Sequence, residues 1–174
     1  MTATAAPWPD ALFATLQDLR IQQVAYVPDA GHSQLIKRCH ADPAIAAVPL
    51  TSEQEGVALL AGAWLGGQRG ALLMQSSGVG NCINMLSLSQ TCRFPLLMIV
   101  TMRGQWGEFN PWQVPMGNAT EAVLKNTGVL VYPVDAAERV AETVAAAGRI
   151  AFNGALSAAV LISQRVIGAK TFGR

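Results

Sequence analysis

The chain has 174 residues, which is enough for one domain with its own buried core but short for two. Hydrophobic residues make up 51% and charged residues 13%, so the composition excludes a disordered chain and predicts that a partner covers part of an apolar surface. The formal net charge is +1 and no basic run occurs, which argues against a nucleic-acid-binding protein.

The first half of the chain alternates helical patterns with short strands. Leu12, Leu16 and Leu19 share one helix face, and Asp10 is placed to cap that helix. Ser33 and Ser52 have the same capping position before two further helices. The predicted elements, in chain order, are a helix at residues 10–20, a strand at 23–27, a helix at 33–40, a strand at 44–49 and a helix at 52–67.

The second half continues this alternation. Continuous apolar runs such as residues 95–101 are typical of strands covered by helices on both faces. Residues 102–115 contain aromatic, Pro and Gly residues without a period, which predicts a functional loop, and Asp135 is placed to cap the last long helix. The predicted elements are a strand at 71–75, a helix at 78–92, a strand at 95–101, a helix at 117–126, a strand at 129–132, a helix at 135–152 and a strand at 157–162.

Strands that alternate with helices predict an α/β fold built from βαβ units. We expect a single three-layer domain spanning residues 1–174, with its core at residues 10–163. A mostly parallel six-stranded sheet would carry helices on both faces. In such a sheet, ligands bind beyond the carboxyl ends of the strands, so the loops that follow strands are the places to search for a site.

Targeting and metal-binding patterns are not evident in the chain. Residues 1–10 lack the charged start and long apolar stretch of a secretory signal, and no apolar run reaches the roughly 18 residues that a membrane helix needs. Cys39, Cys82 and Cys92 form no Cys-x-x-Cys pair and are odd in number, so neither a disulfide framework nor a zinc site is expected. We expect a cytoplasmic protein without membrane contact.

Two carboxylates begin the helix predicted at residues 52–67. Glu53 and Glu55 are separated by about 200° around a helix, so they cannot both face one ligand. Either can be a first-turn acid that the helix dipole stabilises. Glu53 follows a strand and precedes an apolar helix, so it should be buried. Its carboxylate should then either accept a hydrogen bond or have a raised pKa.

The turn Ser76-Ser77-Gly78-Val79-Gly80 follows a strand and opens a helix. It has the features of a phosphate cradle but lacks the P-loop pattern, and a tight turn with a Ser cap and Gly at positive φ is the alternative. No Gly-x-Ser-x-Gly elbow is present, which disfavours a serine hydrolase.

Arg103 follows the most apolar predicted strand, where its guanidinium suits a carboxylate, phosphonate or sulfonate. The alternative is that Arg103 pairs with Glu108 or with carbonyl groups at a helix end. His32 and His40 lack metal-ligand spacing, and a turn or surface position is the alternative for each. We expect no metal site in this chain.

Several strings together resemble the pyrimidine-binding domain of thiamine-diphosphate-dependent 2-oxo-acid decarboxylases. In that family the cofactor-activating Glu is followed nine residues later by Gly, and Glu53 with Gly62 has this spacing. Residues 76–80 resemble the family's T-S-G-P-G turn, with Val79 in place of Pro. Residues 27–29, 102–104 and 113–117 are similar to strings of sulfopyruvate and phosphonopyruvate decarboxylases, most nearly those of alpha subunits of two-chain sulfopyruvate decarboxylases. The resemblance spans residues 12–162.

The resemblance implies a flavodoxin-like pyrimidine-binding (PYR) domain that is catalytic through Glu53, which would hydrogen-bond N1′ of the aminopyrimidine. The positions that would line the cofactor are Glu53, Ser76, Ser77, Gly78 and Asn81. The positions that would hold the distal anion of the substrate are His32, Arg103 and Gln113.

The resemblance also implies that thiamine diphosphate is shared with another chain. In the family, a domain with a Gly-Asp-Gly motif holds the diphosphate and Mg²⁺, and this sequence contains no Gly-Asp-Gly. We therefore expect a beta subunit that supplies this domain and holds Mg²⁺, together with self-association of the assembly.

The expected function is that of the alpha subunit of a carboxy-lyase, active only with its partner, that converts 3-sulfopyruvate to sulfoacetaldehyde and CO₂. One alternative replaces the substrate by phosphonopyruvate or another small anionic 2-oxo acid. An alternative of a different class is a non-catalytic flavodoxin-like binding or assembly module, which the spacing of Glu53 and Gly62 disfavours.

Overall fold

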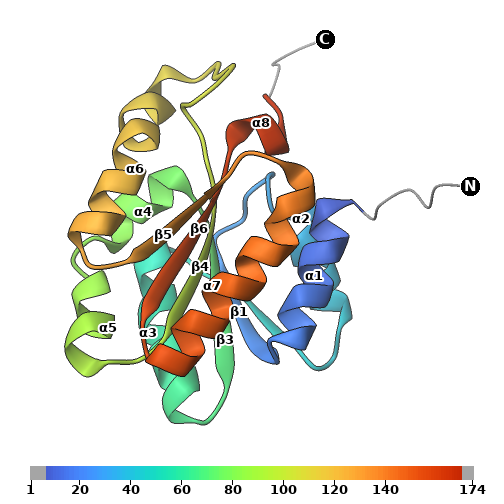
Figure 1. Cartoon of the computed structure of the whole chain (residues 1–174), viewed down its shortest axis with the longest axis vertical. Coiled ribbons are helices and arrows are strands. Elements are labelled where there is room, and N and C mark those ends of the chain that lie inside the picture. Colours follow the sequence, from blue (N-terminus) through green and yellow to red (C-terminus); the bar gives the residue numbers. More distant parts are fainter. Residues whose placement is uncertain (1–6, 170–174) are drawn as a thin grey trace, which may run out of the picture.

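The computed structural model describes residues 7–169 as one α/β domain built around a sheet of six parallel strands. The expectation that the chain begins without a secretory signal falls largely on residues 1–6, which lie outside the described residues. The strands are β1 (Ile21–Tyr26), β2 (Ala46–Pro49), β3 (Arg69–Gln75), β4 (Leu96–Thr101), β5 (Leu130–Val134) and β6 (Ser157–Ile162). They lie in the order β2-β1-β3-β4-β6-β5 (Figure 1).

Helices cover both faces of this sheet (Figure 1). On one face lie α1 (Trp8–Asp18), α2 (Ser33–Ala41) and α7 (Val140–Gly154). On the other face lie α3 (Glu53–Leu65), α4 (Ser76–Cys82), α5 (Leu86–Cys92) and α6 (Val114–Asn126). Short helices η1 (Pro111–Gln113), η2 (Ala137–Arg139) and α8 (Gln164–Ile167) complete the described residues. The predicted three-layer α/β architecture is confirmed.

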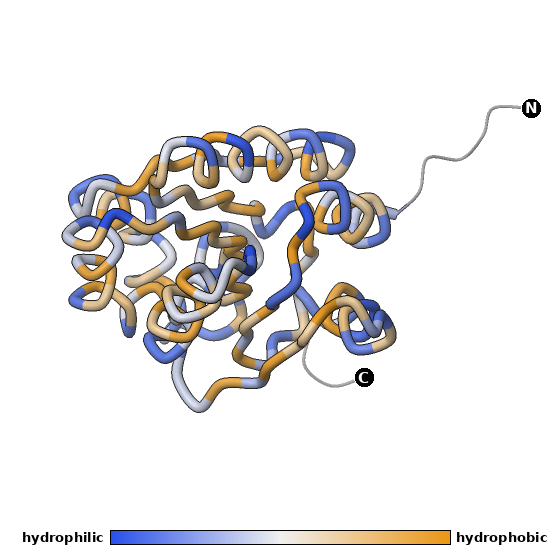
Figure 2. Tube along the Cα trace, turned by 90° about the horizontal axis from the view of Figure 1, so that it is seen from below, coloured by the Kyte–Doolittle hydropathy of each residue, from blue (hydrophilic) through white to orange (hydrophobic). Residues whose placement is uncertain are grey.

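The core is divided by the sheet because successive strand side chains point to opposite faces. In β3, Leu73 packs with α1, α2 and α7, whereas Leu72 and Met74 pack with α3 to α6. All residues of β4 and β6 are buried, which explains why these strands read as continuous apolar runs. Figure 2, which views the molecule from below, shows hydrophobic central segments and helices of mixed hydropathy around them.

The strand order reverses between β1 and β3, because the chain leaves β1 toward β2 on one side and later continues through β3 toward β4 on the other. Ligands of open α/β sheets bind at the carboxyl ends of the strands beside such a switch point. The loops after β1, β3 and β4 meet at this edge, which lies toward the top of Figure 1.

Several predicted boundaries and caps were wrong. The single helix predicted at residues 78–92 is divided into α4 and α5 by a turn at residues 83–85, and α4 begins two residues earlier than predicted. Residues 102–115 are less irregular than predicted, because they contain η1 and the start of α6. The helix α8, only four residues long, was not predicted.

The predicted caps also differ from the structure. Pro7 is the N-cap residue of α1, while Asp10 lies in the first turn and its Oδ1 is 2.6 Å from Nε of Arg38. The N-cap residue of α2 is His32, not Ser33. Ser52 is the N-cap residue of α3, as predicted, but its side chain makes no capping hydrogen bond. The predicted cap before α7 is replaced by η2, which precedes that helix.

Within residues 7–169, no helix has the length and apolar character that a membrane span requires. In the same residues, Cys39 and Cys82 are buried, Cys92 is exposed and all three are free thiols.

Candidate active site

Glu53 lies at the start of α3, where the chain turns from β2 into the helix. Ser52 has an extended backbone, which directs the Glu53 side chain inward, and Glu53 is only 7% exposed. Its Oε2 accepts a hydrogen bond of 2.8 Å from Nδ2 of Asn81 on α4. Of the two outcomes predicted for a buried Glu53, a hydrogen bond or a raised pKa, the structure shows the hydrogen bond. Among residues 7–169 no other hydrogen-bond donor contacts this carboxylate.

Gly78 allows the Glu53 carboxylate to lie directly against the first turn of α4. A Cβ atom at Gly78 would be 2.3 Å from Oε1 of Glu53, a distance that real Cβ atoms do not show. Neither Gly78 nor Gly80 has a positive φ, so Gly78 is needed for close approach and the turn alternative with Gly at positive φ was wrong. Burial, together with the charge of Glu53, raises the pKa of the Cys82 thiol to about 12, so a neutral group faces the carboxylate.

The two serines of the same turn have different surroundings. Ser76 is fully buried, and its Oγ accepts a 3.0 Å hydrogen bond from the backbone N–H of Arg103. Its carbonyl oxygen accepts one from Oγ1 of Thr120. Ser76 therefore joins α4 to the end of β4 and to α6. Ser77 Oγ donates to Oε1 of Gln75 at 3.2 Å.

Asp29, Gln75 and Thr101 form a hydrogen-bonded group across the switch point. Oδ1 of Asp29 accepts from Nε2 of Gln75 at 2.8 Å, and Oδ2 accepts from Oγ1 of Thr101 at 2.6 Å. Burial by itself would raise the pKa of Asp29, but the hydrogen bond from Thr101, the charge of His32 and the hydrogen bond from Gln75 lower it overall. None of the three was predicted as a site residue, although each ends or follows a strand.

His32 lies beside this group and is fully buried. Its Nδ1 is 3.7 Å from Oδ2 of Asp29, beyond hydrogen-bond distance, and neither ring nitrogen has a hydrogen-bond partner among the described residues. Burial lowers the pKa of His32 to about 4 despite the opposing charge of Asp29, so the imidazole is neutral near pH 7.

The depressed pKa of His32 predicts a loss of stability in mild acid. The unfolded chain binds a proton near pH 6.5 whereas the folded protein resists it down to about pH 4. The free energy of unfolding should therefore fall as the pH falls through this interval, by up to about 3 kcal/mol. Urea titrations at pH 7 and pH 4.5 should show a smaller fall for His32→Asn than for the natural chain, and equal falls would contradict the assignment.

The structure places Arg103 in an ion pair with Glu108, the alternative considered from the sequence. Its Nε donates to Oε2 of Glu108 at 2.7 Å and its Nη2 to Oε1 at 2.5 Å. Gln113, on η1, has a buried Oε1 without a hydrogen-bond partner among residues 7–169. Glu108 was not predicted as a site residue.

Four of the predicted site residues form two groups at one edge of the sheet, whereas Ser76 bonds to Arg103, Arg103 pairs with Glu108 and Gln113 has no hydrogen bond through Oε1 among the described residues. Glu53, Gly78 and Asn81 are in direct contact. His32 lies with Asp29, and the hydrogen bond between Ser77 and Gln75 links that group to the first turn of α4.

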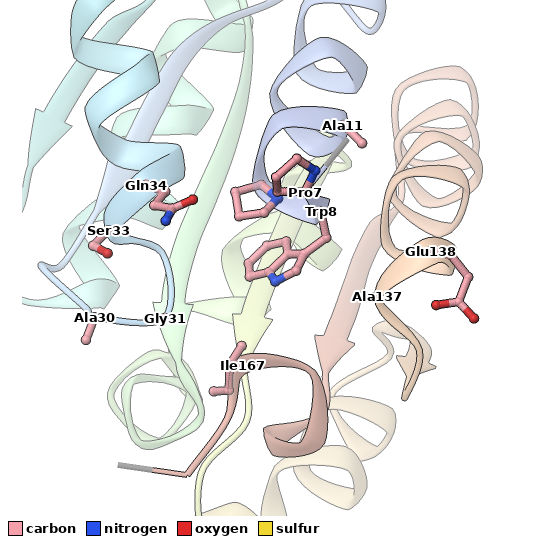
Figure 3. Close-up of a pocket in the computed structure, with 11 residues that line it drawn as sticks. Pro7, Trp8, Ala11, Ala30, Gly31, Ser33, Gln34, Ala137, Glu138 and Ile167 are labelled. Atoms are coloured by element: carbon pink, nitrogen blue, oxygen red, sulfur yellow. The ribbon is translucent and has the colours of Figure 1, made fainter. Parts of the chain in front are cut away.

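A pocket of about 730 Å³ lies elsewhere, between α1, the loop after β1, η2 and α8 (Figure 3). Trp8, Gln34, Glu138 and Ile167 are among the residues around it, and none of the predicted cofactor or substrate residues lines it. The buried carboxylate and the network at the switch point carry the chemically distinctive groups, so we place the candidate site there.

The buried Glu53 at a helix start beside the switch point therefore lies where open α/β domains bind their ligands. Residues 8–114 match the family described as "Thiamine pyrophosphate enzyme, N-terminal TPP binding domain". The chain belongs to this family, which confirms the family inferred from the sequence strings.

Curated relatives have names that agree with this family. The sulfopyruvate decarboxylase subunit alpha of Methanothermobacter thermautotrophicus is 43% identical over 117 residues, covering 67% of this chain and 71% of the relative. The protein of the same name from Methanococcus maripaludis is 30% identical over 154 residues, which cover 88% of this chain and 92% of the relative. The phosphonopyruvate decarboxylase of Streptomyces viridochromogenes is 42% identical over 115 residues, covering 65% of this chain and 29% of that longer protein.

The fold is also found in a solved structure of 2-oxoglutarate:ferredoxin oxidoreductase from Magnetococcus marinus. The two share 14% sequence identity with a TM-score of 0.77, and the match covers 92% of this chain and 29% of the other. At this identity the likeness concerns the fold alone.

Proposed function

We propose that this chain is the alpha subunit of a two-chain thiamine-diphosphate-dependent decarboxylase that converts 3-sulfopyruvate to sulfoacetaldehyde and CO₂. The names of the alpha-subunit relatives support this substrate and the division into subunits. The observation that carries the proposal is the buried Glu53 carboxylate, held by one hydrogen bond at the carboxyl edge of the sheet.

The residues around Glu53 fit an aminopyrimidine ring. Asn81 holds Oε2, and no other donor among residues 7–169 contacts the carboxylate, so Glu53 can accept a hydrogen bond from a protonated ring nitrogen. Glu53 would hold that proton at N1′, while Ser77, Gly78 and Asn81 would line the ring. When bound, the thiazolium of the cofactor supplies the group that accepts the electron pair released as CO₂ leaves. The chain's own contribution is to orient the ring and to exclude water from the carboxylate.

The diphosphate and Mg²⁺ would be held by a beta subunit with a Gly-Asp-Gly motif, which this sequence lacks. The outer face of α3 supports docking of another chain, because Leu65 is 86% exposed and a Cβ at Gly62 would meet nothing within 4 Å. Trp112, which is 85% exposed, adds an aromatic side chain near the same edge as the site. We also propose that the assembled pair self-associates and that it lies in the cytoplasm, where thiols such as its three free cysteines stay reduced.

The distal anion of the substrate would lie near Arg103, with His32 and Gln113 as further polar groups. Both His32 and Gln113 have buried polar atoms without a partner among the described residues, which a bound ligand would satisfy. Arg103 retains donors beyond the two used by Glu108, because a guanidinium carries five N–H groups.

A second candidate substrate is phosphonopyruvate, since two curated relatives with that decarboxylase name are 42% and 40% identical over the aligned residues. A decisive assay mixes this chain with a partner chain carrying Gly-Asp-Gly, adds thiamine diphosphate and Mg²⁺, and measures CO₂ release from both acids. We expect higher kcat/KM for 3-sulfopyruvate. A higher kcat/KM for phosphonopyruvate would make phosphonopyruvate the assigned substrate. If neither acid releases CO₂, the non-catalytic binding or assembly module would be favoured.

A further inference from the structure

The Glu108 carboxylate is the centre of the loop that follows β4. Its side chain is 4% exposed, and it accepts five hydrogen bonds. Two come from Arg103, and two come from the backbone N–H groups of Gly104 and Asn110 at 3.1 and 3.0 Å. The fifth comes from Nε2 of Gln164 on α8 at 3.0 Å. A carboxylate with this many donors is a fixed part of the structure.

The surrounding chain holds the Arg103–Glu108 pair in place from two sides. Gln164 is 1% exposed, and its Oε1 accepts 3.0 Å hydrogen bonds from the backbone N–H groups of Gln105 and Trp106. On the other side, α6 packs so closely that a Cβ at Gly117 would lie 2.0 Å from the Arg103 carbonyl oxygen. The pair therefore has little freedom to rearrange when a ligand binds.

Arg103 is also connected to the candidate active site. Its backbone N–H donates to Oγ of Ser76, which begins α4, and two residues later Gly78 contacts Glu53. The inference below rests on the proposed function, in which the distal anion of the substrate lies near Arg103.

The charge of Arg103 is compensated where it stands. The hydrogen bonds from Arg103 are the largest cause that lowers the pKa of Glu108, to about 2, so the carboxylate is ionised at every pH at which the enzyme would be assayed. The guanidinium is always protonated, so the pair has no net charge. The site can then donate directed hydrogen bonds to an anion but offers little net attraction for a second negative charge.

We propose that Glu108 is a specificity-determining residue that makes the anion site prefer a singly charged sulfonate to a doubly charged phosphonate. A sulfonate carries one charge at neutral pH, whereas a phosphonate, like a phosphate monoester, gains its second charge near neutrality. The dianion would lose more hydration on entering the site and would be repelled by the fixed carboxylate. Rejection of a competitor by an unfavourable charge is an established route to specificity.

The test compares kcat/KM for 3-sulfopyruvate and phosphonopyruvate in the assembled two-chain enzyme at pH 6 and pH 8. Glu108→Gln keeps the side-chain shape but leaves the charge of Arg103 uncompensated. We expect the ratio of the two values to shift toward phosphonopyruvate by about tenfold at pH 8 and by less at pH 6. Glu121→Gln is the matched control, because Glu121 is an exposed acid paired with Lys125 on α6, and its ratio should not change.

A second variant separates charge from loop order. Gln164→Leu removes the loop hydrogen bonds while leaving the Arg103–Glu108 pair, so it should lower kcat/KM for both acids in equal proportion. An equal loss for both acids in Glu108→Gln would overturn the inference, because Glu108 would then act only through loop order. If Glu108→Gln does not fold, the pH dependence of the natural enzyme provides the test. Its ratio of kcat/KM for 3-sulfopyruvate to kcat/KM for phosphonopyruvate should rise from pH 6 to pH 8, and a constant ratio would overturn the inference. Absence of turnover of either acid would instead contradict the proposed function itself.

Discussion

Replacing Glu53 by Gln is expected to lower kcat of the assembled enzyme by a factor of about 10² to 10⁴, the usual contribution of a positioned acid or base. Glutamine keeps the shape and can still accept the hydrogen bond from Asn81, so folding and subunit assembly should be retained. What is lost is the negative charge that would hold a proton on the pyrimidine ring. Turnover measured with saturating cofactor checks the loss of kcat, and the elution volume of the complex in size-exclusion chromatography checks that assembly is retained.

Glu55→Gln is the matched control for this substitution. Glu55 is in the same helical turn but is exposed, and its Oε2 accepts a 3.0 Å hydrogen bond from the backbone N–H of Thr51. Its replacement should change kcat little. Losses of similar size in the two variants would show that the wrong carboxylate has been assigned.

Gly78→Ala should reduce kcat by about 10²-fold, because it displaces the Glu53 carboxylate. The new methyl group would lie 2.3, 2.4 and 2.6 Å from Oε1, Cδ and Cγ of Glu53, so that side chain must rotate away and break its contact with Asn81. Overpacking of this kind also costs about 1–3 kcal/mol of folding stability. Steady-state kinetics and thermal unfolding of the variant measure the two effects separately.

Gly80→Ala provides the control in the same turn. Its methyl group would meet Sδ of Met116 at 3.3 Å, and a flexible thioether can move aside, so activity should be retained. Because Gly78→Ala acts through Glu53, adding it to Glu53→Gln should cause little further loss of turnover. A multiplicative loss in the double variant would mean that Gly78 contributes by a route independent of the carboxylate.

Local patterns in the sequence were sufficient to predict the six strands and to predict which of the two carboxylates, Glu53 or Glu55, is buried. The alternation of strands and helices predicts six strands, and all six are present among residues 7–169. The helical angle between Glu53 and Glu55 predicts that they face different directions, and the structure buries the first and exposes the second. Both inferences depend only on residues close together in the chain.

Contacts between distant residues were not predictable in the same way. Asp29 meets Gln75 and Thr101 across 46 and 72 residues of sequence, because the register of β1, β3 and β4 brings the strand ends together. A sequence alone does not give that register. Likewise, the sequence left open whether Arg103 faces a ligand or Glu108, since the choice depends on Gly104 and Gly107, whose positive φ values fold the loop back.

We propose that this chain supplies the acid for the pyrimidine ring in a site that another chain completes. Isothermal titration of thiamine diphosphate with Mg²⁺ into this chain, into the Gly-Asp-Gly partner and into their mixture tests it most directly. We expect weak binding to this chain alone and tight, Mg²⁺-dependent binding to the mixture, which Glu53→Gln should weaken. Tight binding of the cofactor and its metal by this chain alone would contradict it.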